Sequence, residues 1–397
     1  MTGSVAPSPD PHSAALARGG AAAALAPLWR ALRADLLAVH AALPERVDRR
    51  REWNLPLWEL GHVAWFAERW TLRQPEPWRG AACDPEQALP PGRAADAFYN
   101  SSAVPHAARW QLPLPDRAAT HALLDAQLHA SLARLSEQPH EDNALYLFRL
   151  SLLHEAMHVE AAHLLARALR LTTPAPQAQA AGAELQVPAQ TVTLGMTLGN
   201  PGSGFAFDNE CAGRAVAVPA FRVDARVRRW GEVLPWVEQA YTDDRLWSAA
   251  GLAWRGPRRH PEALRGGPGD WQRTEGQQPL DLDPAAPAEP LSAFEAEAWC
   301  AWAGRRLLRE AEWQAAQAQP GFAWGEVWEW SADVFAPFPG FRPHPYRDYS
   351  APWFDGRHRL LRGASRFTPA VLAHPGFRNF YLPDRSDLVA GLRSAAR

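Results

Sequence analysis

Helical periodicity runs through residues 22–170 of this 397-residue chain and fades after residue 185. Four segments in that part repeat apolar residues every three or four positions, as amphipathic helices do: residues 22–43, 56–73, 117–138 and 142–169. Four long helices of this kind predict a bundle over residues 21–170. The preceding residues, 1–20, contain early prolines, and we expect them to form a flexible tail.

The second half of the chain differs from the first in composition and in its pattern of apolar residues. Residues 171–184 are rich in Ala, Pro, Gln and Thr, which is the composition of a linker. Beyond them, short strand-like pieces such as residues 190–194 lie among many Gly, Pro and Trp residues, and helices are predicted only near residues 229–241 and 292–303. Residues 185–397 therefore predict an irregular α+β domain, and the whole chain a two-domain α+β protein.

Charge and cysteine content exclude several classes of protein. The formal net charge is −2, so no strong basic field indicates a nucleic acid partner. The three cysteines, Cys83, Cys211 and Cys300, form no C-x-x-C pair, which argues against a disulfide scaffold or a thiolate zinc site and favours the reducing cytoplasm. No apolar run is long enough to span a membrane. We expect small-molecule partners, and a monomer or weak dimer.

Three histidines form a candidate metal site. His154 and His158 lie four residues apart on a predicted helix, a spacing that places both rings on one face. His62 lies on a second predicted helix among apolar residues, so its imidazole needs a buried partner. That partner is either a backbone carbonyl, Glu59, or the same metal ion. His40 and His163 are interpreted as surface residues.

The nature of the metal is left open by the spacing alone. Three neutral nitrogen ligands leave coordination positions free, and iron(II) suits oxidative chemistry, although the same set can hold zinc. Residues 154–158 also match the H-E-x-x-H pattern of zinc proteases, in which Glu155 would be the general base, but the chain carries no other protease signature. Glu160 either hydrogen-bonds a metal ligand or faces solvent.

Several segments resemble the sulfoxide synthases of the ergothioneine pathway. The segment LWELGHVAWF (residues 57–66) resembles the first-ligand helix of their DinB-like domain, and His154-x3-His158-x-Glu160 matches their H-x3-H-x-E signature. The second half resembles their formylglycine-generating-enzyme-type, C-type-lectin-like domain. The matching pieces are FAFDNE (205–210), AFEAEAWCAWAGRRL (293–307), EAEW (310–313), VWEW (327–330), LRGAS (361–365), RNF (378–380) and GLR (391–393). Formylglycine generators use a C-terminal cysteine pair, which this chain lacks.

The resemblance implies an iron(II)-dependent enzyme with His62, His154 and His158 as ligands. Its substrates would be dioxygen, N-alpha-trimethylhistidine (hercynine) and a thiolate-type donor, and a bond would form between the chalcogen and imidazole C2. The implied substrate and catalytic residues are Asn379 and Phe380 for hercynine, Arg109 and Arg385 for the donor, and Tyr346 or Tyr349 as proton donor.

Two departures from the pattern bear on the donor. Met157 stands where ergothioneine enzymes often have glutamine, and Tyr381 stands where they usually have aspartate. The segment 378–387 looks like the selenoneine synthase branch, which uses a selenosugar (1-seleno-glucose), and Tyr381 and Asp384 suit a sugar. We therefore predict a selenosugar donor in preference to γ-glutamylcysteine or cysteine. A non-catalytic binding protein and a zinc metallohydrolase are the remaining alternatives.

Overall fold

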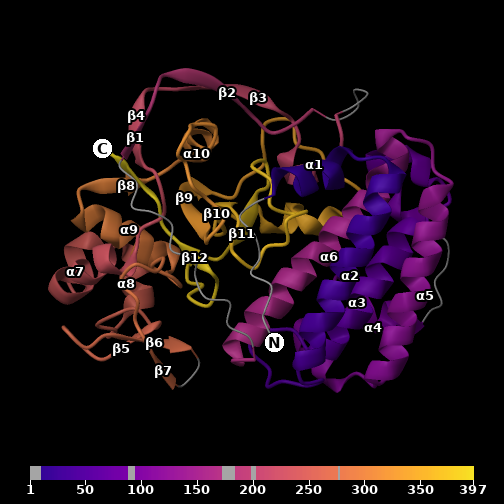
Figure 1. Cartoon of the computed structure of the whole chain (residues 1–397), viewed down its shortest axis with the longest axis horizontal. Coiled ribbons are helices and arrows are strands. Elements are labelled where there is room, and N and C mark those ends of the chain that lie inside the picture. Colours follow the sequence, from indigo (N-terminus) through magenta and orange to yellow (C-terminus); the bar gives the residue numbers. More distant parts are fainter. Residues whose placement is uncertain (1–9, 88–93, 172–183, 198–202, 276–277) are drawn as a thin grey trace.

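The computed structural model describes residues 10–87, 94–171, 184–197, 203–275 and 278–397. It places a helical bundle beside an α+β domain, and α6 of the bundle runs along the boundary between them (Figure 1). The helices of the first half are α1 (Pro11–Gly19), α2 (Ala22–Ala42), α3 (Pro56–Thr71), α4 (Ala94–Tyr99), α5 (Arg117–Ser136) and α6 (Asp142–Ala168), with the short 3-10 turns η1 (Pro77–Ala82), η2 (Pro85–Gln87) and η3 (His106–Gln111).

The four predicted long helices are confirmed as α2, α3, α5 and α6, each ending within two residues of its predicted bounds. They pack as a bundle in which α2 and α5 contact each other, as do α3 and α6, α2 and α6, and α3 and α5. Their apolar faces supply most of the buried core of this half. Among the described residues, no helix combines the length and apolar character needed to cross a membrane.

The tail predicted for residues 1–20 is wrong over residues 11–19, which form helix α1. Asp10 caps this helix by accepting hydrogen bonds from the backbone amides of His12 and Ser13. Arg18 is 4% exposed, and its guanidinium forms a bidentate ion pair with Glu210 of the second half, at 2.7 and 2.9 Å. Residues 1–9 lie outside the described part of the chain.

The second half is the irregular α+β domain that the sequence predicts. Its helices are α7 (Trp230–Ala240), α8 (Ala249–Arg255), α9 (Ala293–Trp302) and α10 (Glu310–Ala316), with the 3-10 turns η4 (Asp208–Glu210), η5 (Asp244–Leu246), η6 (Arg347–Tyr349) and η7 (Ala351–Trp353). The helices predicted near 229–241 and 292–303 are confirmed as α7 and α9, and the strand predicted at 190–194 is confirmed as β2, whereas α8 and α10 were not predicted.

Within the described residues of this half, the strands form two four-stranded and two smaller sheets. One sheet has the order β1-β4-β13-β8, from β1 (Glu184–Val187), β4 (Phe221–Asp224), β13 (Ser394–Ala396) and β8 (Arg305–Leu307). The other has the order β11-β10-β9-β12, from β11 (Asn379–Tyr381), β10 (Arg359–Gly363), β9 (Trp328–Val334) and β12 (Ala390–Gly391). The smaller sheets pair β2 (Gln190–Leu194) with β3 (Arg214–Val218), and β5 (Leu264–Arg265) with β6 (Gln272–Glu275) and β7 (Gln278–Asp281).

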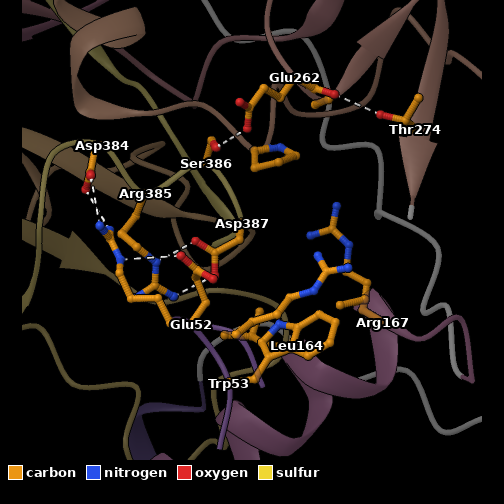
Figure 2. Close-up of a pocket in the computed structure, with 15 residues that line it drawn as sticks. Glu52, Trp53, Leu164, Arg167, Glu262, Thr274, Asp384, Arg385, Ser386 and Asp387 are labelled. Carbon is orange, nitrogen blue, oxygen red and sulfur yellow. Dashed lines mark hydrogen bonds and ion pairs between the residues drawn. The ribbon is translucent and has the colours of Figure 1, made fainter. Parts of the chain in front are cut away.

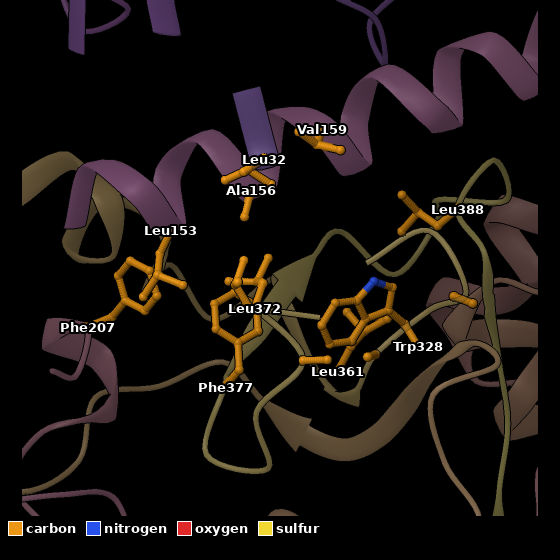
Figure 3. Close-up of a cluster of buried hydrophobic side chains, with 14 of the residues drawn as sticks. Leu32, Leu153, Ala156, Val159, Phe207, Trp328, Leu361, Leu372, Phe377 and Leu388 are labelled. Atoms are coloured by element: carbon orange, nitrogen blue, oxygen red, sulfur yellow. The ribbon is translucent and has the colours of Figure 1, made fainter. Parts of the chain in front are cut away.

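One hydrophobic core joins the two halves. Figure 3 shows Leu153, Ala156 and Val159 on α6 facing side chains of the second half, and all belong to a single buried cluster. The facing residues are Phe207, Trp328, Leu361, Leu372, Phe377 and Leu388. Because α6 packs on both domains, side chains on its boundary-facing turns have a fixed position relative to β10 and β11. Residues 172–183 of the predicted linker lie outside the described residues.

Candidate metal centre

The first of the three histidines is held on helix α3 by aromatic neighbours. Pro56 occupies the first turn of this helix, and His62 follows in its interior at 3% exposure. The ring of Trp58 stacks on the imidazole of His62 at a centroid distance of 4.8 Å and an interplanar angle of 10°. Nδ1 of His62 donates a hydrogen bond to the carbonyl oxygen of Tyr99 at 2.7 Å. The backbone partner considered from the sequence therefore exists, and it leaves Nε2 free as a ligand atom.

The other two histidines lie one turn apart on α6 and meet His62. One ligand atom of each ring lies within 4.8 Å of the corresponding atoms of the other two. Two nitrogens bound to one ion at about 2.1 Å can be at most about 4.2 Å apart, so a small closure of the rings completes the set. His154 is buried and stacks on Phe66 at 3.5 Å, and its Nδ1 has no hydrogen-bond partner among the described residues.

Burial keeps two of these imidazoles neutral. Burial is the main cause, and the nearby His158 a smaller one, that lowers the pKa of His62 to about 3. Burial also holds the pKa of His154 well below its usual value, and the neighbouring rings of His158 and His62 add to the effect. A neutral imidazole offers a nitrogen lone pair without first losing a proton, so this set fits a divalent metal ion.

Glu59 orients the third histidine. Its Oε1 lies 3.3 Å from Nδ1 of His158 and also accepts a hydrogen bond from Nδ2 of Asn54 at 3.1 Å. Burial opposes ionisation of Glu59, but the hydrogen bond and charge of His158 outweigh it, so the pKa of Glu59 lies below its usual range. A carboxylate that holds Nδ1–H of a ligand histidine directs Nε2 at the metal and raises its basicity.

We expect Glu59→Ala to lower the affinity for a divalent metal ion by about 10- to 100-fold, because Nδ1 of His158 loses its partner. Glu59→Gln keeps a carbonyl oxygen acceptor and should lose less. Glu68→Ala is the control, since Glu68 lies on the same helix but pairs with Arg73. Titration of the metal-free proteins with iron(II) measures the effect. Equal affinities for the parent and the three variants would show that Glu59 does not support the metal site.

The protease interpretation of residues 154–158 is wrong. Glu155, which would be the general base, is 0% exposed, and its carboxylate accepts hydrogen bonds from Nε1 of Trp29 at 2.7 Å and Nε of Arg33 at 2.6 Å. These partners belong to α2, so the side chain of Glu155 is bound inside the bundle and is not a wall of the histidine pocket.

Two further polar residues of the sequence analysis are also buried. His40, interpreted as a surface residue, is 1% exposed, and burial lowers its pKa to about 4. Oε1 of Glu160 accepts hydrogen bonds from Trp328, Ser365 and Thr368 at 2.6–2.8 Å. Glu160 is therefore not solvated, and it ties α6 to the second half.

A cavity of about 650 Å³ opens beside the three histidines. It is lined by elements from both halves, and most of the site residues predicted from the sequence lie on its wall. These are His62, His154, His158, Met157, Arg109, Tyr346, Tyr349, Asn379, Phe380 and Tyr381. The structure thus brings together side chains separated by more than 300 positions, from α3, η3, α6, η6 and β11.

The two candidate proton donors pack against different aromatic rings in this wall. The ring of Tyr346 lies 6.2 Å from that of His154 and 4.9 Å from that of Phe66. Burial raises the pKa of Tyr346 to about 12, against a smaller opposing effect of its hydrogen bond with Ser101. Tyr349 instead stacks on Phe207 at 4.6 Å, and its ring centroid lies 5.9 Å from that of Tyr346. Of the two candidates, Tyr346 is therefore the one whose ring lies against a metal ligand, His154, and its neighbour Phe66.

The predicted hercynine-binding pair forms an aromatic part of the wall. Phe380 stacks on Phe335 at 4.0 Å, and the ring of Trp353, which is 41% exposed, lies 6.3 Å from it. Oδ1 of Asn379 accepts a hydrogen bond from the backbone amide of Phe380 at 2.9 Å, which leaves its amide nitrogen free for other contacts. An electron-rich ring face of this kind suits a quaternary ammonium group.

Arg385 lies in a neighbouring cavity of about 410 Å³ rather than on the wall of the histidine pocket. Figure 2 shows it beside Asp387, with which it forms an ion pair at 2.5–2.6 Å. Its guanidinium also lies 4.9 Å from the centroid of the Tyr381 ring. The two cavities share Leu164 as a lining residue. A role of Arg385 in donor binding stays a prediction.

Several wall residues were not predicted. Asn54, Ser101, Ser102, Asp348 and Trp353 line the cavity from loops and short turns. These residues do not form a recognisable sequence motif, because small polar residues are common in loops. Only long-range packing brings them close to the histidines.

The chain is similar to one family model, to several named proteins and to solved structures. The family described as "Sulfatase-modifying factor enzyme 1-like domain" matches residues 172–324, which confirms the formylglycine-generating-enzyme-like part of the prediction. A protein named hercynine oxygenase from Mycolicibacterium smegmatis is 30% identical, over 85% of this chain and 90% of its own. One of the same name from Mycolicibacterium thermoresistibile is 29% identical, over 85% and 86%. The solved structure of PvdO from Pseudomonas aeruginosa is 17% identical and covers 53% of this chain and 93% of its own, with a TM-score of 0.36.

Proposed function

Because this chain belongs to the hercynine oxygenase family, we propose that it is an iron(II)- and dioxygen-dependent enzyme that joins a chalcogen donor to C2 of the hercynine imidazole. The observation that carries the proposal is the convergence of three imidazoles from two helices, two of them held neutral, on one wall of a cavity. Bound there, iron(II) supplies the redox exchange with dioxygen that oxidative bond formation requires.

The reaction with a thiol donor balances without a further reductant. The C2–H and S–H bonds break and a C2–S bond forms. One atom of dioxygen becomes the sulfoxide oxygen, and the other leaves as water with the two hydrogens. Dioxygen is the oxidant, and the carbon and sulfur centres supply the electrons. The contribution of the protein is to orient both substrates and to hold a proton where oxygen is reduced.

Phe380 and Asn379 are the residues proposed to bind hercynine. The faces of Phe380 and Trp353 attract the trimethylammonium group by cation–π interaction, and the free amide nitrogen of Asn379 can donate a hydrogen bond to the carboxylate. Tyr346 is proposed as the proton donor because its ring lies nearer to the ligand histidines than that of Tyr349 and its raised pKa keeps it protonated.

The donor has two candidates. The family relationship favours a thiol, cysteine or γ-glutamylcysteine. The second candidate is the selenosugar, and the composition of the wall favours it. Among the described lining residues, Arg109 is the only arginine, in a chain whose sequence has no lysine, whereas γ-glutamylcysteine carries two carboxylates. The polar lining also includes the amide of Asn54 and the hydroxyls of Ser101 and Ser102, which can form hydrogen bonds with a neutral sugar.

The test is oxygen consumption by iron-loaded protein that depends on hercynine, with donors in competition and products weighed by mass spectrometry. We expect rapid oxygen uptake only when hercynine and a donor are both present, and metal-free protein is the control. More product from cysteine or γ-glutamylcysteine supports the thiol candidate, and more from 1-seleno-glucose supports the selenosugar. Hercynine binding without oxygen uptake would identify a binding protein, and zinc-dependent activity without oxygen would identify a hydrolase.

A further inference from the structure

The proposed proton donor lies on an irregular segment, residues 344–350, that is attached at both ends to buried groups outside it. We propose that Tyr146 and Asp208 are positioning residues that hold this segment, and with it Tyr346, beside the metal ligands. The inference rests on the proposed function for its catalytic consequence, but the attachment itself is a property of the chain.

Tyr146 connects the segment to the helix that carries two metal ligands. It lies on α6, eight residues before His154, and its hydroxyl shares a hydrogen bond with Nδ1 of His344. The same hydroxyl lies 3.3 Å from the carbonyl oxygen of Ala206. Burial lowers the pKa of His344 to about 4, so its ring is neutral and Nδ1 can accept. Burial raises the pKa of Tyr146 far above its usual value, so the hydroxyl stays a donor.

Asp208 holds the segment at both of its ends. Its carboxylate accepts a hydrogen bond from the hydroxyl of Ser350, and it also interacts with the backbone amide of His344. Asn209 adds a hydrogen bond from Nδ2 to the hydroxyl of Ser350 at 3.0 Å. Asp208, Asn209 and Ser350 are each at most 2% exposed, so no water competes for these contacts.

The turn that contains Asp208 is itself fixed to two other parts of the chain. Arg18 of α1 pairs with Glu210, the last residue of η4. Nη1 of Arg378 donates to the carbonyl oxygen of Asn209 at 2.6 Å, and Arg378 directly precedes Asn379. Helix α6 and turn η4 therefore form one frame that fixes the ligand histidines, the proposed proton donor and the proposed hercynine-binding strand relative to one another.

The middle of the segment has weaker support. A hydrogen bond from Ser102 to Asp348 and the contact of Tyr346 with Ser101 connect it to the loop after α4, and both Ser102 and Asp348 are at the exposed mouth of the cavity. A displacement of about 1 Å can cost about 100-fold in rate when the reacting groups must be aligned. Loss of a buried end attachment should therefore affect turnover far more than it affects folding.

Tyr146→Phe removes one hydroxyl and leaves the ring in place. We expect the kcat for the hercynine reaction to fall by about 10-fold, with KM for hercynine and iron affinity within about twofold of the parent. Amide hydrogen exchange in residues 344–350 should become faster, also in metal-free protein. The matched control is Tyr241→Phe, which removes a buried hydroxyl bonded to Glu295 at 2.9 Å in the second half, and which should change neither kcat nor exchange in this segment.

Asp208→Ala should lower kcat further than Tyr146→Phe does and should speed amide exchange at both ends of the segment. Asp208→Asn keeps one carbonyl oxygen acceptor, so its kcat and its exchange rates should lie close to those of the parent. The proposal is overturned if exchange in residues 344–350 is the same in Tyr146→Phe, Asp208→Ala and Tyr241→Phe, or if kcat falls equally in all three. If the parent protein does not turn over hercynine, the proposed function fails, and the exchange measurement still decides whether the two residues hold the segment.

Discussion

His154→Ala should lose iron binding and, with it, hercynine-dependent oxygen uptake. Substitutions of groups that only support a metal ligand already cost about 10- to 100-fold in metal affinity, so loss of a ligand should cost at least about 100-fold. Only His62 and His158 would remain from the cluster of possible metal ligands in the described part of the chain. Iron content after dialysis and oxygen uptake with hercynine measure the two effects.

His163→Ala is the matched control for that experiment. His163 also lies on α6, is partly buried, and stacks on an aromatic ring, that of Phe367 at 5.7 Å, but it does not line the histidine cavity. Both substitutions remove a stacked imidazole from the same helix, so a comparable loss of thermal stability is expected, and only His154→Ala should lose iron. Normal iron content and oxygen uptake in His154→Ala would refute the metal centre and the function built on it.

The long helices could be predicted because their signal is local. In α2, α3, α5 and α6 apolar residues recur at helical spacing, and that pattern needs no knowledge of the partner helix. Helix α1 was missed because its stability depends on a distant contact, the ion pair of Arg18 with Glu210. The same reason hid the burial of Glu155, whose partner Arg33 lies 122 positions away, and of His40.

The metal ligands were accessible to sequence reasoning for a similar reason. The spacing of His154 and His158 is a local property of one helix, and the apolar context of His62 already required a buried partner. The rest of the cavity depends on where two loops lie. Residues 101–109 and 344–353 have no periodic pattern, and long-range bonds such as those of Tyr146 with His344 and Ser102 with Asp348 position them. The sequence could therefore nominate both Tyr346 and Tyr349 but could not rank them.

The replacement Tyr346→Phe tests that ranking and should lower the rate of carbon–chalcogen bond formation by at least about 100-fold, because a positioned proton donor contributes about 10²- to 10⁴-fold. Iron content and hercynine affinity should stay within about twofold, since the ring remains against Phe66 and His154. The raised pKa of Tyr346, about 12, keeps the donor protonated, so the rate of the parent enzyme should not fall through loss of this proton at any pH below about 11.

Tyr349→Phe is the control for this replacement, because its ring lies three positions further along the same segment, against Phe207. It removes a hydroxyl from the same wall of the cavity, so any general loosening of residues 344–350 should affect both variants alike. We expect Tyr349→Phe to retain the rate within about tenfold of the parent. A larger loss in Tyr349→Phe than in Tyr346→Phe would transfer the role of proton donor to Tyr349. If Tyr346→Phe and Tyr349→Phe both react at the rate of the parent, neither phenol supplies the proton, because a phenylalanine ring has no acidic hydrogen.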